Sequence, residues 1–109
     1  KGGPKELYYS LSIEKWAVQK GFSVKREYRG TDLLLASGNG LKIAVEIACR
    51  KENQVTNIKR DLALRIFSKI VVACETEKVL EQVREEYMSS GISPEGCKIA
   101  FLPVTEIMA

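Results

Sequence analysis

The chain has 109 residues, of which 45% are hydrophobic and 28% are charged, and its formal net charge is +3. This composition is typical of one soluble globular domain and excludes collagen-like, disordered and disulfide-scaffold proteins. No apolar run approaches the roughly 18 residues needed to cross a bilayer, and no secretory signal opens the chain, so we expect no membrane partner. The net charge permits nucleic-acid binding, although a protein that coats DNA is expected to be more basic.

The sequence contains no histidine, which excludes Ser-His-Asp and Cys-His catalysis, histidine-ligated zinc and a histidine general base. Its three cysteines, Cys49, Cys74 and Cys97, are far apart and form no C-x-x-C pair. We interpret them as small core hydrophobes in a reducing compartment, which places the protein in the cytoplasm. Because the sequence opens with Lys-Gly-Gly-Pro and no methionine, we expect residues 1–109 to be a single domain excised from a larger protein.

The first half of the chain predicts one helix followed by three strands. Residues 5–20 follow a proline, which suits a first helical turn, and contain no further Gly or Pro. Alternating β-prone residues predict strands at 22–28, 31–36 and 41–48. The Ser-Gly-Asn-Gly sequence at 37–40 predicts a hairpin turn between the last two of these strands.

The predicted first helix carries an unusual acid. At 100° per residue, Leu7, Leu11 and Val18 fall on one stripe, which we expect to be buried. Glu14 lies in the middle of that stripe, either as a functional acid or as an exposed charge at the edge of a helix interface. Trp16 lies opposite the stripe and packs either against a second layer or against a partner.

The second half of the chain alternates helices and strands. We expect a helix at 52–67, a strand at 69–74, a helix capped by threonine at 76–90, a strand at 97–102 and the start of a helix at 105–109. The nearly continuous apolar run at 69–74 predicts a parallel strand buried on both faces. The order αβββαβαβ therefore predicts a single α/β domain with a mixed sheet flanked by helices. No glycine-rich phosphate loop follows a strand, which disfavours a doubly wound nucleotide-binding domain.

Two acids interrupt the predicted strands. Asp32 opens the second strand, and Glu46 lies deep in the third strand among apolar neighbours. If the hairpin pairs these strands, the two carboxylates share a face and repel each other, so a positive group must compensate them. Mg²⁺ or Mn²⁺ would suit oxygen ligands and could activate water beside a phosphodiester. The alternatives are that Asp32 is an ordinary turn residue and that Glu46 is a structural acid paired with Lys42 or with a helix residue.

These residues resemble a known signature. Asp32, a hairpin and then Glu46-Ile47-Ala48 resemble the D…(E/D)-x-K pattern of the PD-(D/E)XK, or restriction-endonuclease-like, superfamily, whose core has the order αβββαβ. The strand ending in Glu46-Ile47, followed by Asn57-Ile58-Lys59, is similar to nuclease-like domains appended to ATPases and helicases of mobile elements. The strands at 69–73 and 97–102 also resemble that group.

The resemblance implies a three-layer restriction-endonuclease-like core and a DNA-processing function. The expected activity is Mg²⁺-dependent endonucleolytic hydrolysis of DNA, with an ATPase or helicase domain of the same or another chain as a further partner. Many relatives act as dimers, so a homodimer is also left open.

The resemblance assigns roles residue by residue. Asp32 and Glu46 match the metal-binding acids, and Glu14 matches the acid of the first helix. The lysine that would polarise water stands two residues after the second acid, where this chain has Ala48. Three explanations stay open: Lys59 has taken over the lysine's role, the domain has lost catalysis and kept nucleic-acid binding, or Ala48 is an engineered replacement. Lys59 also has a plain interpretation as a lysine that extends from the edge of an apolar stripe into solvent.

Basic and amide side chains follow the first helix and the third strand. Lys20 and Lys25 belong to the first group, and the second group begins directly after the strand that holds Glu46. These residues could contact phosphates or bases, although charged loop residues are usually only solvated and Asn at a helix start is often a cap. The candidate DNA-binding residues are Arg26, Arg29, Arg50, Lys51, Gln54, Asn57 and Arg60.

The sequence therefore supports two functions. The first is a DNA-binding nuclease domain that uses a divalent metal. The second is a catalytically inactive nuclease-like module for DNA binding or protein docking, which the alanine at the lysine position favours.

Overall fold

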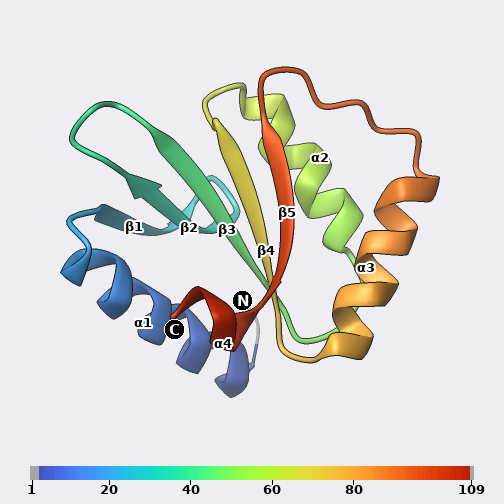
Figure 1. The fold of residues 1–109 in the computed structure, drawn as a ribbon, viewed down its shortest axis with the longest axis horizontal. Coiled ribbons are helices and arrows are strands. Elements are labelled where there is room, and N and C mark those ends of the chain that lie inside the picture. Colours follow the sequence, from blue (N-terminus) through green and yellow to red (C-terminus); the bar gives the residue numbers. More distant parts are fainter. Residues whose placement is uncertain (1–2, 109) are drawn as a thin grey trace.

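The computed structural model describes residues 3–108 and has the predicted order of elements (Figure 1). The strands are β1 (Ser23–Tyr28), β2 (Thr31–Ala36), β3 (Lys42–Ala48), β4 (Lys69–Cys74) and β5 (Lys98–Pro103). The helices are α1 (Pro4–Gln19), α2 (Gln54–Leu64), α3 (Glu77–Ser89) and α4 (Val104–Ile107). The strand bounds differ from the predicted ones by at most one residue. The last residue of the helix predicted at 105–109 lies outside the described residues.

The five strands form one mixed sheet in the order β1-β2-β3-β4-β5. β1, β2 and β3 are an antiparallel meander, and β3, β4 and β5 are parallel. The meander turns at the predicted hairpin, where Gly40 has a φ of 88°, a value that favours glycine. The parallel strands are joined by α2 and α3, as crossover connections require. The prediction of a three-layer α/β domain is confirmed.

One face of the sheet is covered by α2 and α3. Its core contains Leu34, Ala44 and Ala48 from the sheet together with Ile58 of α2 and Val83 of α3. α3 begins at Thr76, whose hydroxyl accepts a hydrogen bond from the Val79 N–H, as predicted for a threonine cap. Figure 1 shows both helices on the same side of the strands.

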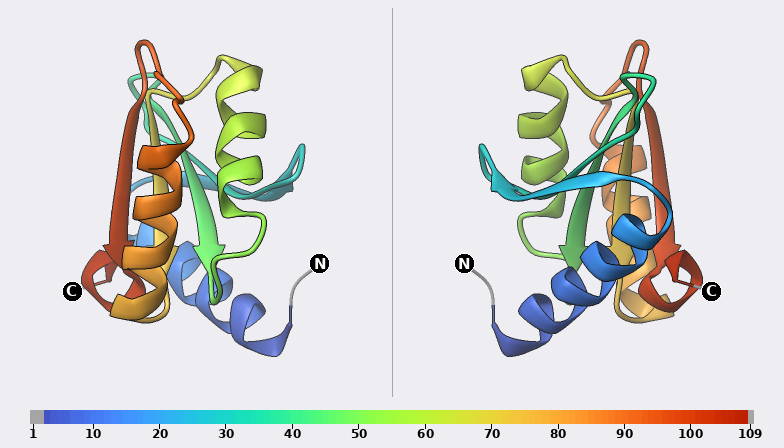
Figure 2. Two further views of the ribbon diagram at one scale, coloured as in Figure 1. Left: turned by 90° about the vertical axis from the view of Figure 1, so that its right-hand side faces the viewer. Right: turned by 90° about the vertical axis from the view of Figure 1, so that its left-hand side faces the viewer.

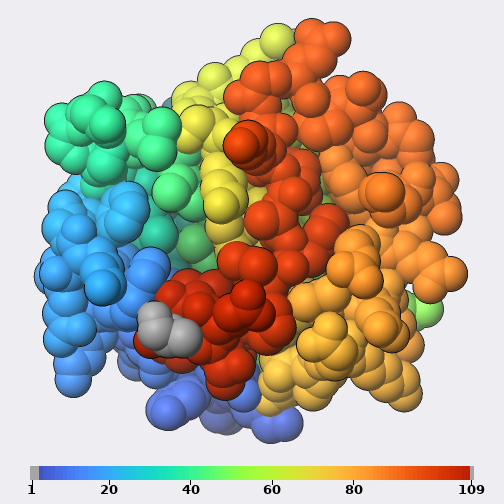
Figure 3. Space-filling model, viewed as in Figure 1, coloured from blue at the N-terminus to red at the C-terminus, as the bar shows by residue number. Residues whose placement is uncertain are grey.

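The other face is covered by α1 and α4. Its core contains Leu33, Val45 and Val71 from the sheet with Ile13 of α1 and Val104 of α4. In Figure 3 α4 and β5 (red) lie between α1 (blue) and α3 (orange), while atoms of β4 (yellow) remain visible beside them. A hollow of about 280 Å³ lined mainly by apolar side chains, among them Trp16, Leu35 and Val45, opens on this face.

The first helix is rotated relative to the prediction, which is wrong on this point. Leu7, Leu11 and Val18 are 55%, 42% and 55% exposed, whereas Ile13 and Ala17 are fully buried. The helix carries apolar residues on two sides, and periodicity alone does not say which side meets the sheet. The small Ala17 lets the helix backbone approach the strands closely.

Trp16, whose surroundings the sequence left open, packs with Tyr9 against the core between α1 and the sheet. The Tyr9 hydroxyl donates a hydrogen bond of 2.9 Å to Glu75 Oε2, just beyond the end of β4. Lys5 Nζ lies 3.4 Å from the same oxygen. These contacts hold the N-terminal half of α1 beside the carboxyl ends of the parallel strands.

The second helix is shorter than the predicted 52–67. Asn53, with a φ of 68°, precedes its first residue, and Arg65, with a φ of 55°, follows its last. A left-handed residue ends helical hydrogen bonding, so the apolar residues after Arg65 leave the helix and lead into β4. Ile58 is the fully buried apolar residue of α2.

Within residues 3–108, no helix is long and apolar enough to span a bilayer. The cysteines are free thiols; Cys74 is fully buried, whereas Cys49 and Cys97 are half-buried. Burial raises the pKa of the Cys74 thiol to about 11. Cys74 is therefore the core hydrophobe that the sequence predicted, and the other two lie at the edges of the core.

Candidate functional site

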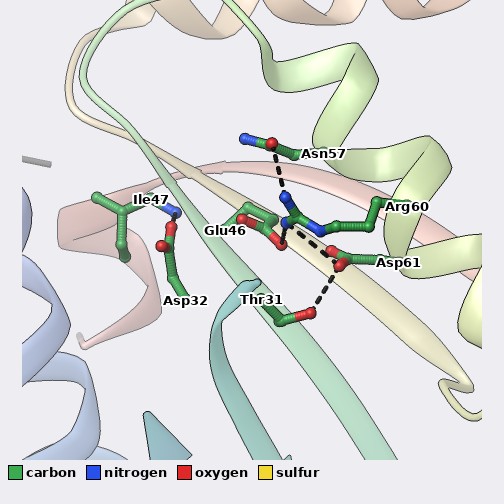
Figure 4. A network of polar contacts seen from close by, with 7 residues as sticks. All are labelled: Thr31, Asp32, Glu46, Ile47, Asn57, Arg60 and Asp61. Atoms are coloured by element: carbon green, nitrogen blue, oxygen red, sulfur yellow. Dashed lines mark hydrogen bonds and ion pairs between the residues drawn. The ribbon is translucent and has the colours of Figure 1, made fainter. Parts of the chain in front are cut away.

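Asp32 and Glu46 lie on neighbouring strands but have different partners. Asp32 is one step beyond the pair formed by Leu33 of β2 and Val45 of β3, which places it beside Glu46. Asp32 Oδ2 accepts a hydrogen bond of 2.8 Å from the backbone N–H of Ile47. Figure 4 shows the Asp32 carboxylate beside Ile47 and the Glu46 carboxylate turned toward α2.

Glu46 belongs to a buried polar cluster, which we call the β3–α2 cluster (Thr31, Glu46, Asn57, Arg60 and Asp61). Glu46 Oε2 lies 3.0 Å from Arg60 Nη2, and Asp61 Oδ1 lies 3.5 Å from the same nitrogen. Thr31 donates its hydroxyl hydrogen to Asp61 Oδ1 at 2.6 Å. Glu46, Asp61 and Thr31 are all 0% exposed. Glu46 is thus paired with a helix residue, one of the two structural alternatives open from the sequence.

The cluster contains two carboxyl groups and one guanidinium group. Burial, a hydrogen bond with Asp61 and the charges of Asp61 and Asp32 together raise the pKa of Glu46 to about 10, against the lowering effect of Arg60. Glu46 Oε1 and Asp61 Oδ2 are buried and have no hydrogen-bond partner with favourable geometry among the described residues. A proton on Glu46, shared with Asp61 through this hydrogen bond, reduces the negative charge that is buried beside Arg60.

Arg60 is held in place from several sides. Asn57 Oδ1 accepts a hydrogen bond of 3.1 Å from Arg60 Nη1. A Cβ added to Gly30 would lie 3.0 Å from Arg60 Nε, and Gly30 has a φ of 88°, so the β1–β2 turn needs glycine at this contact. Figure 2 shows that this turn (cyan) reaches past α2. Arg60, on α2, therefore contacts both the β1–β2 turn and Glu46 of β3.

Asp61 is a member of the site that the sequence analysis missed. It follows Ile58 by three positions and precedes Leu62, so it falls on the apolar side of α2. An acid at that spacing is buried when the helix covers a sheet, and this spacing is the signal that could have identified it.

Neither Ala48, at the position of the expected lysine, nor Lys59, its proposed substitute, provides a cation to Asp32 and Glu46. Ala48 is 0% exposed and packs in the core under α2 and α3, where a lysine would bury its charge. Lys59 is exposed on α2, and the cation that binds Glu46 is Arg60. The structure therefore brings neither residue to the acidic pair as a catalytic cation.

Glu14 does not join the two strand acids. Its Oε1 lies 3.3 Å from Arg26 Nε in a surface ion pair, on the exposed side of α1. The acid of α1 that approaches Asp32 is Glu6, because both residues line the same two hollows. Glu6 also accepts a hydrogen bond from the Gly3 N–H and so caps the start of α1.

Two adjoining hollows flank Asp32 at the carboxyl end of β3. Arg26 lines the first, of about 350 Å³, and Arg50, Gln54 and Asn57 line the second, of about 310 Å³. Ligands of α/β proteins bind beyond the carboxyl ends of parallel strands, which is where these hollows lie. Four of the seven predicted DNA-binding residues thus surround Asp32, which is itself one of the two predicted metal ligands.

The remaining predicted DNA-binding residues lie outside the hollows. Arg29 is exposed at the β1–β2 turn and lies 5.8 Å from the ring centre of Tyr28, and Lys25 lies 5.6 Å from the same ring. Lys51 is exposed before α2. Arg60 is held in the β3–α2 cluster with its side chain 33% exposed.

The site provides few ligands for a divalent cation. Among residues 3–108, no three His, Cys, Asp or Glu side chains converge as a group that could hold a metal ion. Glu46 is engaged by Arg60, and Asp32 Oδ2 accepts from the Ile47 backbone. Asp32 and Glu46 in these positions do not fit a shared Mg²⁺ or Mn²⁺, and the metal site remains a prediction.

No protein-family model, no curated protein and no solved structure matches this chain.

Proposed function

We propose that the chain is a nucleic-acid-binding domain of nuclease-like architecture that does not itself hydrolyse DNA. The order αβββαβαβ and the neighbouring acids of β2 and β3 support the nuclease-like part of this proposal. The resemblance of the sequence to the PD-(D/E)XK superfamily makes DNA the expected ligand.

The state of Glu46 carries the proposal. A metal-binding carboxylate of a nuclease must be ionised and reachable from the scissile phosphate. Glu46 is 0% exposed, bound to Arg60 and kept protonated by burial and by Asp61, which raise its pKa to about 10. With Ala48 in place of the lysine, the two groups that would activate water are both missing from the open side of the site. The acid has instead a structural role in holding α2 on the sheet.

Nucleic-acid binding is supported by the groups around the hollows. Arg50 offers a positive charge, and Gln54 and Asn57 offer amides of the kind that recognise bases. Lys51 follows Arg50 in the sequence and is also exposed, so two neighbouring cations are available to phosphates beside the hollow.

The second candidate function is Mg²⁺-dependent DNA hydrolysis. One observation favours it: Asp32 and Glu46 lie at neighbouring positions of the paired strands β2 and β3. Binding of a dication would then have to displace Arg60 and expel the shared proton.

Fluorescence anisotropy with a labelled DNA tests the binding function. We expect affinity for duplex or single-stranded DNA in EDTA, falling steeply with salt. The double variant Arg50→Gln, Lys51→Gln should weaken binding and lower the slope of log K against log salt by about one to two. The matched control is the double variant Lys78→Gln, Arg84→Gln, which removes two exposed cations of α3. Absence of DNA binding, or equal weakening in the control, would contradict the proposal.

Cleavage assays separate the two candidate functions. We expect supercoiled plasmid to stay intact with Mg²⁺ or Mn²⁺. Metal-dependent nicking that Asp32→Asn and Glu46→Gln both abolish would establish the nuclease and overturn the inactive assignment.

A further inference from the structure

The two edge strands of the sheet, β1 and β5, differ in how they are protected against pairing with a further strand. An edge strand presents a row of backbone N–H and C=O groups that another extended segment can bind. On β1, Lys25, Arg26 and Glu27 are exposed, and Glu27 has a φ of 52°, which interrupts the extended conformation. On β5, the sequence between Lys98 and Pro103 is Ile-Ala-Phe-Leu. β1 is therefore protected along its length, whereas β5 is protected only at its two ends.

The outer backbone groups of β5 belong to Ile99 and Phe101. The N–H of Lys98 donates a hydrogen bond of 3.0 Å to the Ser68 carbonyl, so Lys98 and every second residue after it turn their backbone groups toward β4. The N–H and C=O groups of Ile99 and Phe101 point away from β4, and within residues 3–108 no backbone group bonds to them. In the left view of Figure 2, β5 (red) forms the border of the sheet, and only α4 lies beyond its end. This edge can therefore accept a further strand.

The side chains of β5 are complementary to a second, antiparallel copy of the same strand. Pairing about a two-fold axis at Ala100 places Ile99 of each copy opposite Phe101 of the other, on the side of the α2/α3 core. A β-branched residue opposite an aromatic residue is a favourable cross-strand pair. Because Ile99 and Phe101 carry the outward backbone groups, each such pair also exchanges two hydrogen bonds. The small Ala100 side chains meet on the axis and let the two strands approach.

Charges at the two ends of β5 favour the same register. Lys98 and Lys69 are neighbours across β4 and β5, and within residues 3–108 neither lies at ion-pair distance from an acid. Lys98 alternates with Leu102, so its side chain lies on the α1/α4 side of the sheet. Glu106 of α4 is exposed on that same side, beyond the other end of β5. An antiparallel second copy brings each Lys98 to the strand end that carries Glu106.

We propose that β5 is a dimerisation edge, at which two copies of this chain pair antiparallel and join their five-stranded sheets into one. The paired strands are only about 20 Å long. A contact of that length stays below the roughly 1,200–2,000 Å² buried in stable complexes. The dimer is therefore reversible and dissociates on dilution. The inference does not depend on DNA binding.

Sedimentation velocity and amide hydrogen exchange, measured over a protein concentration series from micromolar to millimolar, test the proposal. We expect the sedimenting mass to rise from that of one chain to that of two. Over the same series the backbone N–H groups of Ile99 and Phe101 should exchange more slowly, on the order of tenfold once about nine in ten chains are paired. The N–H groups of β1, the other edge of the sheet, are the internal control and should not change.

Charge variants test the register. Lys98→Glu and Glu106→Lys each set like charges against each other in a dimer of identical chains, and each should weaken association on the order of tenfold. A one-to-one mixture of the two variants restores opposite charges at both contacts and should associate like the wild type. Because each variant alone lacks these opposite charges, recovery in the mixture shows that the contact lies between two chains.

A change on the two-fold axis tests the seam itself. Ala100→Lys places two like charges directly opposite each other and should weaken association by at least about tenfold. Ala63→Lys makes the same change on the exposed side of α2 and should leave association unchanged. Circular dichroism checks that both variants fold.

Three results would overturn the proposal. The first is a monomer at every concentration, which would leave the edge to an extended segment of another protein. The second is association with slower exchange in α1 or β1 and none at Ile99 and Phe101. The third is a mixture of the two charge variants that does not recover.

Discussion

The two faces of the sheet are built on different principles. The face under α1 and α4 has an entirely apolar core, from Ile13 and Leu33 to Val104. The face under α2 and α3 has an apolar core of similar character but also buries Glu46 and Asp61. A hollow opens on each side: one of about 280 Å³ on the apolar face, and one of about 370 Å³ lined by Asp61, Leu62 and Phe67 on the other.

The difference shows what buried polar groups contribute. Apolar contacts are not directional, so the first face tolerates a helix rotated from the side that periodicity favours. On the second face, Arg60 reaches its acids only when α2 and the β1–β2 turn are in register with β3. We infer that the β3–α2 cluster contributes more to the position of α2 than to the free energy of unfolding.

The largest loss of stability is expected from truncation of the two fully buried isoleucines, one on the helix of each face. Ile58→Ala on α2 and Ile13→Ala on α1 each create a cavity, and such changes cost about 2–5 kcal/mol. We expect Ile58→Ala near the upper end and Ile13→Ala near the lower end, because the apolar hollow lined by Trp16 and Val45 gives the side chains around Ile13 room to move into a cavity. Urea denaturation followed by circular dichroism measures the free energy of unfolding of both variants. An equal or reversed order of the two losses would show that the hollow does not let the core around Ile13 relax.

Removal of the cation of the cluster should have the next largest effect. Arg60→Met leaves Glu46 and Asp61 without a positive partner and should lower the free energy of unfolding by about 2–3 kcal/mol, below the range for fully buried pairs because Arg60 is 33% exposed. Arg26→Met, which breaks the surface pair with Glu14, is the control and should cost less than about 1 kcal/mol. If the two variants lose similar amounts of free energy of unfolding, the Arg60 ion pairs contribute no more than a surface ion pair does.

The shared proton makes stability depend on pH. The pKa of Glu46 rises from 4.5 to about 10 in the fold, so between these values the unfolded chain loses a proton that the native protein keeps. Native stability therefore falls as pH rises, by up to about 1.4 kcal/mol per pH unit from this group. Glu46→Gln mimics the protonated acid and has no proton to lose. Its stability relative to the wild type should increase steadily from pH 5.5 to pH 8, and a constant difference would exclude the shared proton.

The smallest effect is expected on the outer side of α1. Leu11 is 42% exposed, so Leu11→Gln should change the free energy of unfolding by no more than about 0.5 kcal/mol. If the predicted stripe faced the sheet, the same change would bury a polar amide and cost several times more. Thermal denaturation distinguishes the two orientations of the helix.

Much of the site could be anticipated from the chain, but its chemistry could not. Asp32 and Glu46 stand out as acids in β-prone segments, and the strand pairing does place them beside each other. That Glu46 turns to Arg60, and that Asp61 joins it, depends on how α2 docks on the sheet. Spacing along α2 places Asp61 near the apolar side, but only the docked helix shows which oxygens meet.

The sequence by itself determined the elements, their order and the mixed sheet, because strand alternation, turn residues and capping act over a few neighbouring positions. It also determined which residues of β3 share a face, with Ile43 and Val45 on one side of the strand and Ala44 and Glu46 on the other. Only the tertiary structure decided the rotation of α1, the pairing of Glu46 with Arg60 and the gathering of Glu6, Asp32 and Asn57 around one hollow. Those outcomes depend on contacts between residues far apart in the chain, and local periodicity carries no information about them.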